Sequence, residues 1–446
     1  MRPEQPGVKL DLDDIQNGAL HPRPLPYAGA YVFLRIGDRH AGRELLRRML
    51  PSLADATKPA DAAQQAWVSA ALTFQGLKAL GVPRDSLDSF PLAFQQGMAA
   101  RAAMLGDVGE NGPEHWESPL GSPDVHIGIS ALSPDTARLE AVLGPALKVL
   151  QQLPGVEAIW RQDCQVPADM RNPFGFMDGI SNPGIEGSGI PGSNPQEQPI
   201  KAGEFFLGYP NELDELPPMP APELLGRNGT YVVMAKFHTR VAAFRQYLRA
   251  NAAGQAAQAR LAAKIVGRWP SGAPLALAPD QDDPELGDDP LRNDDFLYAA
   301  DDALGLKCPF GSHARRMNPR DSEIIGVTRI HRILRRGTSY GPMLPAGALE
   351  DDGVDRGIVF VFVGADLERQ FEFVKRDWVN KGLFIGAQSE MDPLIGPNDG
   401  TGQFTIPQKP IRQRLKGLPA FVTNRGGEYF FAPGLRALRW LADLDT

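Results

Sequence analysis

Residues 311–336 form the densest group of side chains that could do chemistry. The segment holds seven Arg and two His against two acidic residues. Two interpretations compete: a solvated basic patch, or a site that holds an anionic group close to a His. The segment lacks the interleaved aromatic residues typical of single-stranded nucleic-acid binding. Because guanidinium binds carboxylate in a bidentate fork, the segment suits a ligand that carries carboxylates.

The metal-ligating residues narrow the kind of site. The two cysteines, Cys164 and Cys308, exclude a disulfide framework and a four-cysteine zinc or iron–sulfur centre. No pair among the seven histidines has the zinc spacing His-Glu-x-x-His. A haem needs only one axial His and carries two propionate carboxylates. The lack of a zinc-spaced His pair and the arginine-rich segment are therefore both compatible with haem.

Strand-like runs about 200 residues apart indicate an internal duplication. Residues 29–34 and 229–234 are short apolar, β-branched and aromatic runs, which predict buried strands. Amphipathic stretches that predict helices follow them, at 41–50 and 240–263. From periodicity alone, two strand–helix units that look alike by chance remain an alternative.

A second pair of units supports the duplication. Residues 125–132 and 357–363 predict strands, and Asp135 and Asp366 then begin helices. Asp at such a position accepts hydrogen bonds from the free N–H groups of a helix start. Two copies of a strand–helix–strand–helix plan predict an α+β fold of two ferredoxin-like domains, with antiparallel sheets and flanking helices.

We place the domain boundary in the Pro/Gly-rich stretch between the copies, giving domains at 1–215 and 216–446. The second domain carries an insertion at about 270–306. Ten Asp or Glu and one Arg lie between residues 280 and 302, so we expect a solvated surface loop with no core of its own.

Overall composition limits the partners. The 446 residues include 42% hydrophobic and 22% charged residues with a net charge of −8, which is typical of a globular protein without a nucleic-acid footprint. Residues 1–20 contain no apolar signal-peptide core, and no apolar run could span a membrane. We expect a cytoplasmic protein that does not bind membranes, with a homodimer left open.

Three segments resemble, in the same order along the chain, the signature segments of dye-decolorizing peroxidases. GFMDG at 175–179 resembles the GxxDG motif, FGSHAR at 310–315 the proximal-histidine segment, and RRGTSYG at 335–341 the distal-arginine segment. Further similarity lies at 371–378 and 421–433. The resemblance implies two ferredoxin-like domains, with one haem b per chain held mainly by the second.

The resemblance also implies the principal roles. His313 is the expected axial ligand of the iron. Asp178 is the expected carrier of the peroxide proton, as general base and then acid. Arg335 is expected to offset the negative charge that develops on the leaving oxygen. Adjacent side chains on an extended segment point to opposite faces, so Arg336 is the alternative to Arg335.

Further residues are expected around the cofactor. Arg315 and Arg332 of the basic segment are expected to bind it. Phe360 and Phe362 alternate on one predicted strand, and we expect at least one of them to wall the distal pocket, although both could equally belong to the core.

A carboxylate that accepts a hydrogen bond from the axial His would raise its basicity. By family position this partner is Asp399, with Glu390 and Asp392 as rivals. Bulky dyes would not enter a small distal pocket, so oxidation could occur at the surface, with Trp378 and Tyr340 as candidate radical sites.

The expected function is therefore oxidation of bulky aromatic or dye-like substrates by hydrogen peroxide through a ferryl intermediate. The alternative is haem handling of the deferrochelatase kind with little peroxidase turnover. A third hypothesis is a haem-free interaction protein with a duplicated α+β fold.

Overall fold

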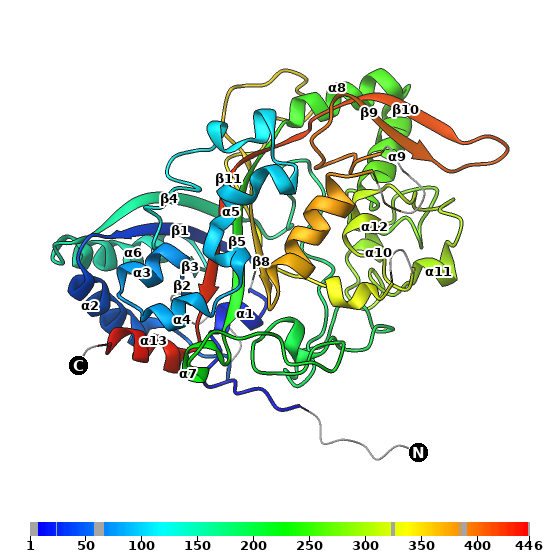
Figure 1. Cartoon of the computed structure of the whole chain (residues 1–446). Helices are drawn as coiled ribbons and strands as arrows, with labels where there is room; N and C mark the ends of the chain where they lie inside the picture. Colours follow the sequence, from blue (N-terminus) through cyan, green and yellow to red (C-terminus); the bar gives the residue numbers. More distant parts are fainter. Residues whose placement is uncertain are drawn as a thin grey trace, which may run out of the picture.

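A nine-stranded antiparallel sheet forms the centre of the computed structural model, which describes residues 8–23, 25–57, 67–322, 326–382, 384 and 390–444. Its strand order is β4-β1-β3-β2-β11-β5-β8-β6, and β7 also pairs with β8. Figure 1 labels the strands from β4 to β8 of this order. The strands are β1 Tyr27–Ile36, β2 Trp67–Leu72, β3 Ile127–Ser133, β4 Val156–Val166, β5 Thr230–Thr239, β6 Leu334–Arg335, β7 Thr338–Tyr340, β8 Gly357–Gly364 and β11 Val422–Ala432.

The strand order confirms the predicted fold class. In the first half, the four strands lie in the order fourth, first, third, second, which is the ferredoxin-like arrangement. The second half repeats that order with β11, β5, β8 and the β6–β7 pair. One residue pair, Phe431 with Leu72, joins the halves between β11 and β2. The boundary at residue 215 remains a prediction.

The two faces of the sheet bury different sets of side chains. Because side chains alternate along a strand, Tyr31 and Phe33 of β1 pack with Val359 and Val361 of β8 on one face. The outer strands β4 and β7 contact each other, so the sheet curls around this cluster. The opposite face holds the largest core, in which Leu34 packs under the helices.

Helices cover that second face as the amphipathic stretches predict. The helices of the first half include α2 Arg39–Met49, α3 Phe74–Ala79, α5 Leu92–Leu105 and α6 Thr136–Gln151. Helix α13 Leu435–Ala442 returns to pack against α2. Asp135 accepts the N–H of Arg138 at the start of α6, at 2.8 Å. Asp366 accepts the N–H of Arg369 at 2.9 Å, as predicted, but the turns that follow are π-helical, Leu367–Glu372 and Val374–Val379.

The stretch 240–263 forms two helices instead of one. These are α8 Val241–Asn251 and α9 Gln255–Val266. The first helix ends before Ala252, whose backbone is extended, and Gly254 with a φ of 79° directly precedes the first residue of α9. None of the described helices is long and apolar enough to cross a membrane.

The acidic insertion is not the solvated loop that its composition predicts. Leu275, Leu286, Phe296 and Tyr298 pack with Trp269 into a small core of their own. The short helices α10 Pro284–Gly287 and α11 Tyr298–Asp301 lie within it. The expectation that this block builds no core was therefore wrong, because its apolar residues are spaced to meet below an acidic surface.

Candidate functional site

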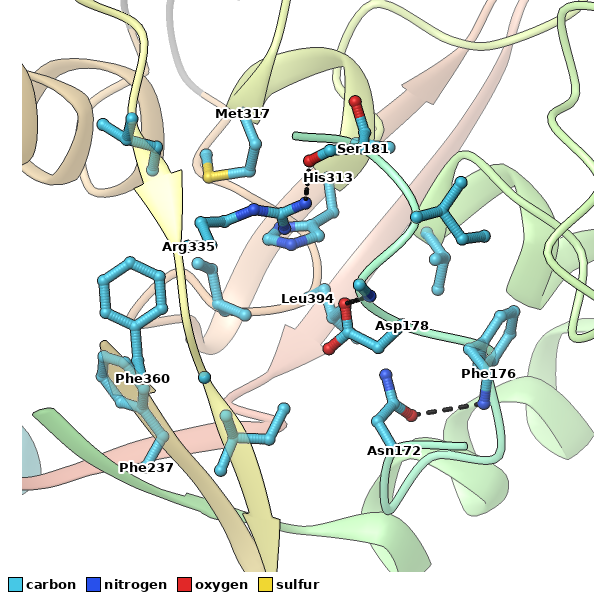
Figure 2. Close-up of a pocket in the computed structure, with 18 of the residues that line it drawn as sticks. Asn172, Phe176, Asp178, Ser181, Phe237, His313, Met317, Arg335, Phe360 and Leu394 are labelled. Carbon is cyan, nitrogen blue, oxygen red and sulfur yellow. Dashed lines mark hydrogen bonds between the residues drawn. The ribbon is translucent and has the colours of Figure 1, made fainter. Parts of the chain in front are cut away.

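A cavity of about 450 Å³ collects the segments that the motifs singled out. Its walls come from the loop at 170–182, from α12 His313–Met317, from β6–β7 and from β8. Figure 2 shows His313, Asp178 and Arg335 around the same space, each from a different segment. Residues distant in sequence therefore share one site.

His313 is the first residue of α12, and its ring is held by a buried carboxylate. Nδ1 of His313 lies 2.9 Å from Oδ2 of Asp392, whose side chain is 0% exposed. The other oxygen, Oδ1, accepts the N–H groups of Leu394 and Ile395 at 2.8 and 2.9 Å. With Nδ1 donating to the carboxylate, the Nε2 lone pair is free for a ligand.

The surroundings of Asp392 favour its ionised form. Burial alone would raise the pKa of Asp392, but the facing His313, with Arg316 and the N–H of Ile395, holds that pKa below its usual value. Arg316 is itself buried and donates to the carbonyls of Gly311, Trp378 and Glu390. This network fixes the segment that carries Asp392 behind the imidazole.

The expectation for Asp399 was wrong. Asp399 is exposed at the start of β9 (Asp399–Ile406) and accepts both the N–H and the hydroxyl of Thr401. The rival Glu390 accepts the N–H of Thr405 at 2.9 Å. Only the tertiary packing of residues 390–398 behind α12 distinguishes Asp392 from its neighbours.

Asp178 lies on a tight loop. Gly175 and Gly179 have φ of 88° and 79°, which side chains rarely tolerate. The backbone N–H of Asp178 donates to the carbonyl of Met170 at 3.0 Å, and its Oδ1 accepts the N–H of Gly179 at 2.7 Å. The carboxylate is exposed to the cavity, with Oδ2 free of any described partner (Figure 2).

Arg335 and Arg336 both border the cavity but differ in environment. Nη2 of Arg335 donates to the carbonyl of Ser181 at 2.8 Å, beside the Asp178 loop (Figure 2). Arg336 is buried and donates to the carbonyls of Leu20 and Arg335. Burial, with the neighbouring Arg23, lowers the pKa of Arg336 to about 9.

Two further expectations about the cofactor-binding residues were wrong. Arg315 does not line the cavity: it is 1% exposed, pairs with Asp302 at 3.1 Å and lies over the ring of Tyr298. Phe362 is buried in the core under the helices. Arg332 and Phe360 do line the cavity, and Arg332 donates to Asn318 at 3.0 Å.

Neither candidate radical site lies at the surface. Trp378 and Tyr340 are each 2% exposed. Trp378 packs against Phe384 behind α12, and Tyr340 lies inside the curled sheet. Both side chains pack with core residues. Their burial depends on this packing and could not be predicted from their positions in the sequence.

Sequence reasoning missed the part of the site that the insertion builds. Asp294 is 1% exposed and pairs with Arg268, at 2.5 Å, and with Arg320. Both arginines line the cavity, and Arg320 stacks 3.7 Å from the ring centroid of Phe296. The sequence contained a signal of this arrangement, because the acidic stretch at 280–302 comes shortly before the basic segment at 311–336. Neighbouring blocks of opposite charge can form ion pairs.

The donors around the cavity fit a haem. Seven Arg and Lys375 line it against two carboxylates, Asp107 and Asp178, so an anionic ligand is favoured there. Among the described residues, no three His, Cys, Asp or Glu gather into a metal-binding group. One imidazole with a free Nε2 in a cationic, partly apolar cavity is the donor set that haem takes.

Comparisons with known proteins identify the family of the chain. No family model matches the chain. The dye-decolorizing peroxidase msp1 of Mycetinis scorodonius is 30% identical over 435 residues, 89% of this chain and 79% of that protein. The fungal peroxidase of this type from Auricularia auricula-judae superposes with a TM-score of 0.84 at 26% identity, over 98% of this chain and all of that one.

A dye-decolorizing peroxidase in complex with 2,6-dimethoxyphenol superposes equally well, with a TM-score of 0.84 at 26% identity over 97% of this chain and 100% of that one. These likenesses span nearly the whole chain and include both ferredoxin-like halves. The chain therefore belongs to the dye-decolorizing peroxidase family and is a haem peroxidase.

Proposed function

We propose that the chain binds one haem b through Nε2 of His313, with hydrogen peroxide as oxidant and phenolic or dye-like aromatic compounds as reducing substrates. The observation that carries the proposal is the His313–Asp392 pair on one side of a cavity that Asp178 and Arg335 also enter. The relative bound to 2,6-dimethoxyphenol supports the substrate class.

The residues of this chain have separable tasks at that site. Haem supplies the iron at which the O–O bond of peroxide is broken. Asp392 holds the His313 proton on Nδ1 and so keeps Nε2 available as a ligand. Arg320 and Arg332, which line the cavity, provide cations for the propionates.

We assign the transfer of the peroxide proton to Asp178. Its free Oδ2 can accept the proton of peroxide and return it to the distal oxygen, as a general base and then acid. The guanidinium of Arg335 donates to the Ser181 carbonyl at 2.8 Å, and its positive charge beside the cavity would offset negative charge on the leaving oxygen. The loop glycines let the backbone approach a flat ligand closely.

The test is an absorption spectrum of the haem-loaded protein and of His313→Ala. We expect His313→Ala to lose stable haem or to show the Soret band of a different ligand, whereas the exposed His40→Ala retains the wild-type spectrum. Unaltered haem content and spectrum in His313→Ala would refute the ligand assignment. Turnover of peroxide with 2,6-dimethoxyphenol separates a peroxidase from a protein that only carries haem.

A further inference from the structure

A basic hairpin extends away from the body of the protein. Strands β9 Asp399–Ile406 and β10 Gln413–Pro419 form a separate two-stranded sheet that projects at one side of the molecule (Figure 1). Residues 408–416 contain four cationic side chains and no acidic one. Ile411 at the tip is 76% exposed, which places it among the most exposed large apolar side chains of the described residues.

The charges of this hairpin are not neutralised within the chain. Lys409, Arg412 and Lys416 are exposed, and none forms an ion pair with any residue that the structure describes. Most arginines near the cavity, by contrast, meet a carboxylate or a carbonyl. A group of cations around an exposed apolar tip is complementary to a surface that is acidic and partly apolar.

The insertion offers such a surface on the same chain. Its exposed acids Asp280, Glu285 and Asp288 have no ion-pair partner in the described part of the chain. Leu291 and Leu304 belong to the same insertion and are 78% and 63% exposed. The hairpin and the acidic insertion therefore match in charge and in apolar character.

We propose that two copies of this chain associate through these surfaces, with each hairpin seated on the acidic insertion of the other copy. The hairpin and the helices α10–α11 lie toward the same side of the molecule (Figure 1). One twofold axis can then form both contacts at once, because a twofold interface brings each patch to its complement twice. A free polyanion would neutralise the cations but would leave the exposed leucines uncovered.

The ionic strength of the solution controls this association. The net charge of −8 on each copy opposes approach at long range. At about 0.1 M salt the Debye length is roughly 10 Å, so that repulsion is screened while contacting pairs still attract. Higher salt weakens the pairs as well, and the dimer should dissociate progressively.

Sedimentation velocity of the haem-loaded protein tests the proposal. We expect a dimer at about 0.1 M NaCl that weakens at about 0.5 M. Lys409→Glu/Arg412→Glu and, separately, Asp280→Lys/Glu285→Lys should each raise the dissociation constant at least about tenfold. A mixture of the two variants should form a heterodimer, because one of its contacts joins two reversed surfaces, the other joins two unchanged surfaces, and both are attractive.

The control pair Arg39→Glu/Lys78→Glu makes the same change in net charge as the hairpin reversal, but on the exposed faces of α2 and α3, away from the hairpin (Figure 1). It should leave the dimer intact, and turnover per haem should be unchanged in every variant. A monomeric wild-type protein at about 0.1 M NaCl, or a dimer that neither reversal weakens, would overturn the proposal. Failure of the mixed variants to associate would also overturn it.

Discussion

Replacing Asp392 by Asn tests the link between a buried carboxylate and the ligand that it orients. Oδ1 of Asp392 accepts the N–H groups of Leu394 and Ile395, and Oδ2 faces Nδ1 of His313. An Asn that keeps the first two hydrogen bonds must turn its amide N–H toward His313. Nδ1 would then have to accept, which moves the ring proton to Nε2 and blocks the ligand lone pair.

The magnitude follows from the geometry. The carboxylate is 0% exposed and lies 2.9 Å from the ring, so water cannot replace the lost bond. Loss of such a partner typically weakens metal binding about 10–100-fold. That range corresponds to roughly 1.4–2.7 kcal/mol. The lower basicity of the imidazole should also shift the reduction potential of the iron to more positive values.

Transfer of haem to excess apomyoglobin, followed at the Soret band, measures the effect. We expect transfer from Asp392→Asn to be about 10–100 times faster than from the wild-type protein. Asp399→Asn makes the same chemical change at an exposed position that does not contact His313, and should behave as wild type. Equal transfer rates and potentials for the two variants would refute the assignment of Asp392.

Three further outcomes follow from the structure. Arg335→Leu should slow the stopped-flow reaction with peroxide by about 10²–10³-fold, far more than Arg336→Leu; the reverse order would move the role to Arg336. Asp178→Asn should slow the same step by about 10²–10⁴-fold while haem stays bound, and a loss below about tenfold would count against it. Burial raises the pKa of Glu428 well above its usual value, so the folded protein retains a proton that the unfolded chain releases above a pKa of about 4.3. The free energy of unfolding of the wild type should therefore fall as pH rises, by about 1.4 kcal/mol per unit of pKa shift. The fall should be smaller in Glu428→Gln. Urea unfolding of both proteins at about pH 5 and about pH 8 measures this, and an equal pH dependence in the two proteins would exclude it.

The local parts of the fold could be predicted from the sequence. Continuous apolar runs in β1 and β8, and Asp135 and Asp366 before apolar-periodic runs, determine strands and helix starts through interactions within a few residues. The break at Gly254 and the π-helical turns after Asp366 could not be predicted, because they depend on packing against the sheet and the site.

The residues of the site also separate into those that a local motif indicates and those that only tertiary packing decides. The GFMDG, FGSHAR and RRGTSYG segments identified Asp178, His313 and Arg335, because each carries its side chain within a short local motif. The choice among carboxylates at 390–399 could not be made, since Asp392 is separated from His313 by 79 residues and only the packing of that segment behind α12 decides it.

By itself, the sequence determined the α+β duplication and the family, and it singled out three motif segments that the structure brings to one cavity. All of these depend on local pattern. Only the tertiary structure decided that Arg315 turns to Asp302, that Phe362 belongs to the core and that Asp294 holds Arg268 and Arg320 beside the cavity. The physical reason is that a charged or aromatic side chain can reach several partners. Burial then selects the arrangement in which each guanidinium meets a carboxylate or a carbonyl, because a buried charge left unpaired costs several kcal/mol.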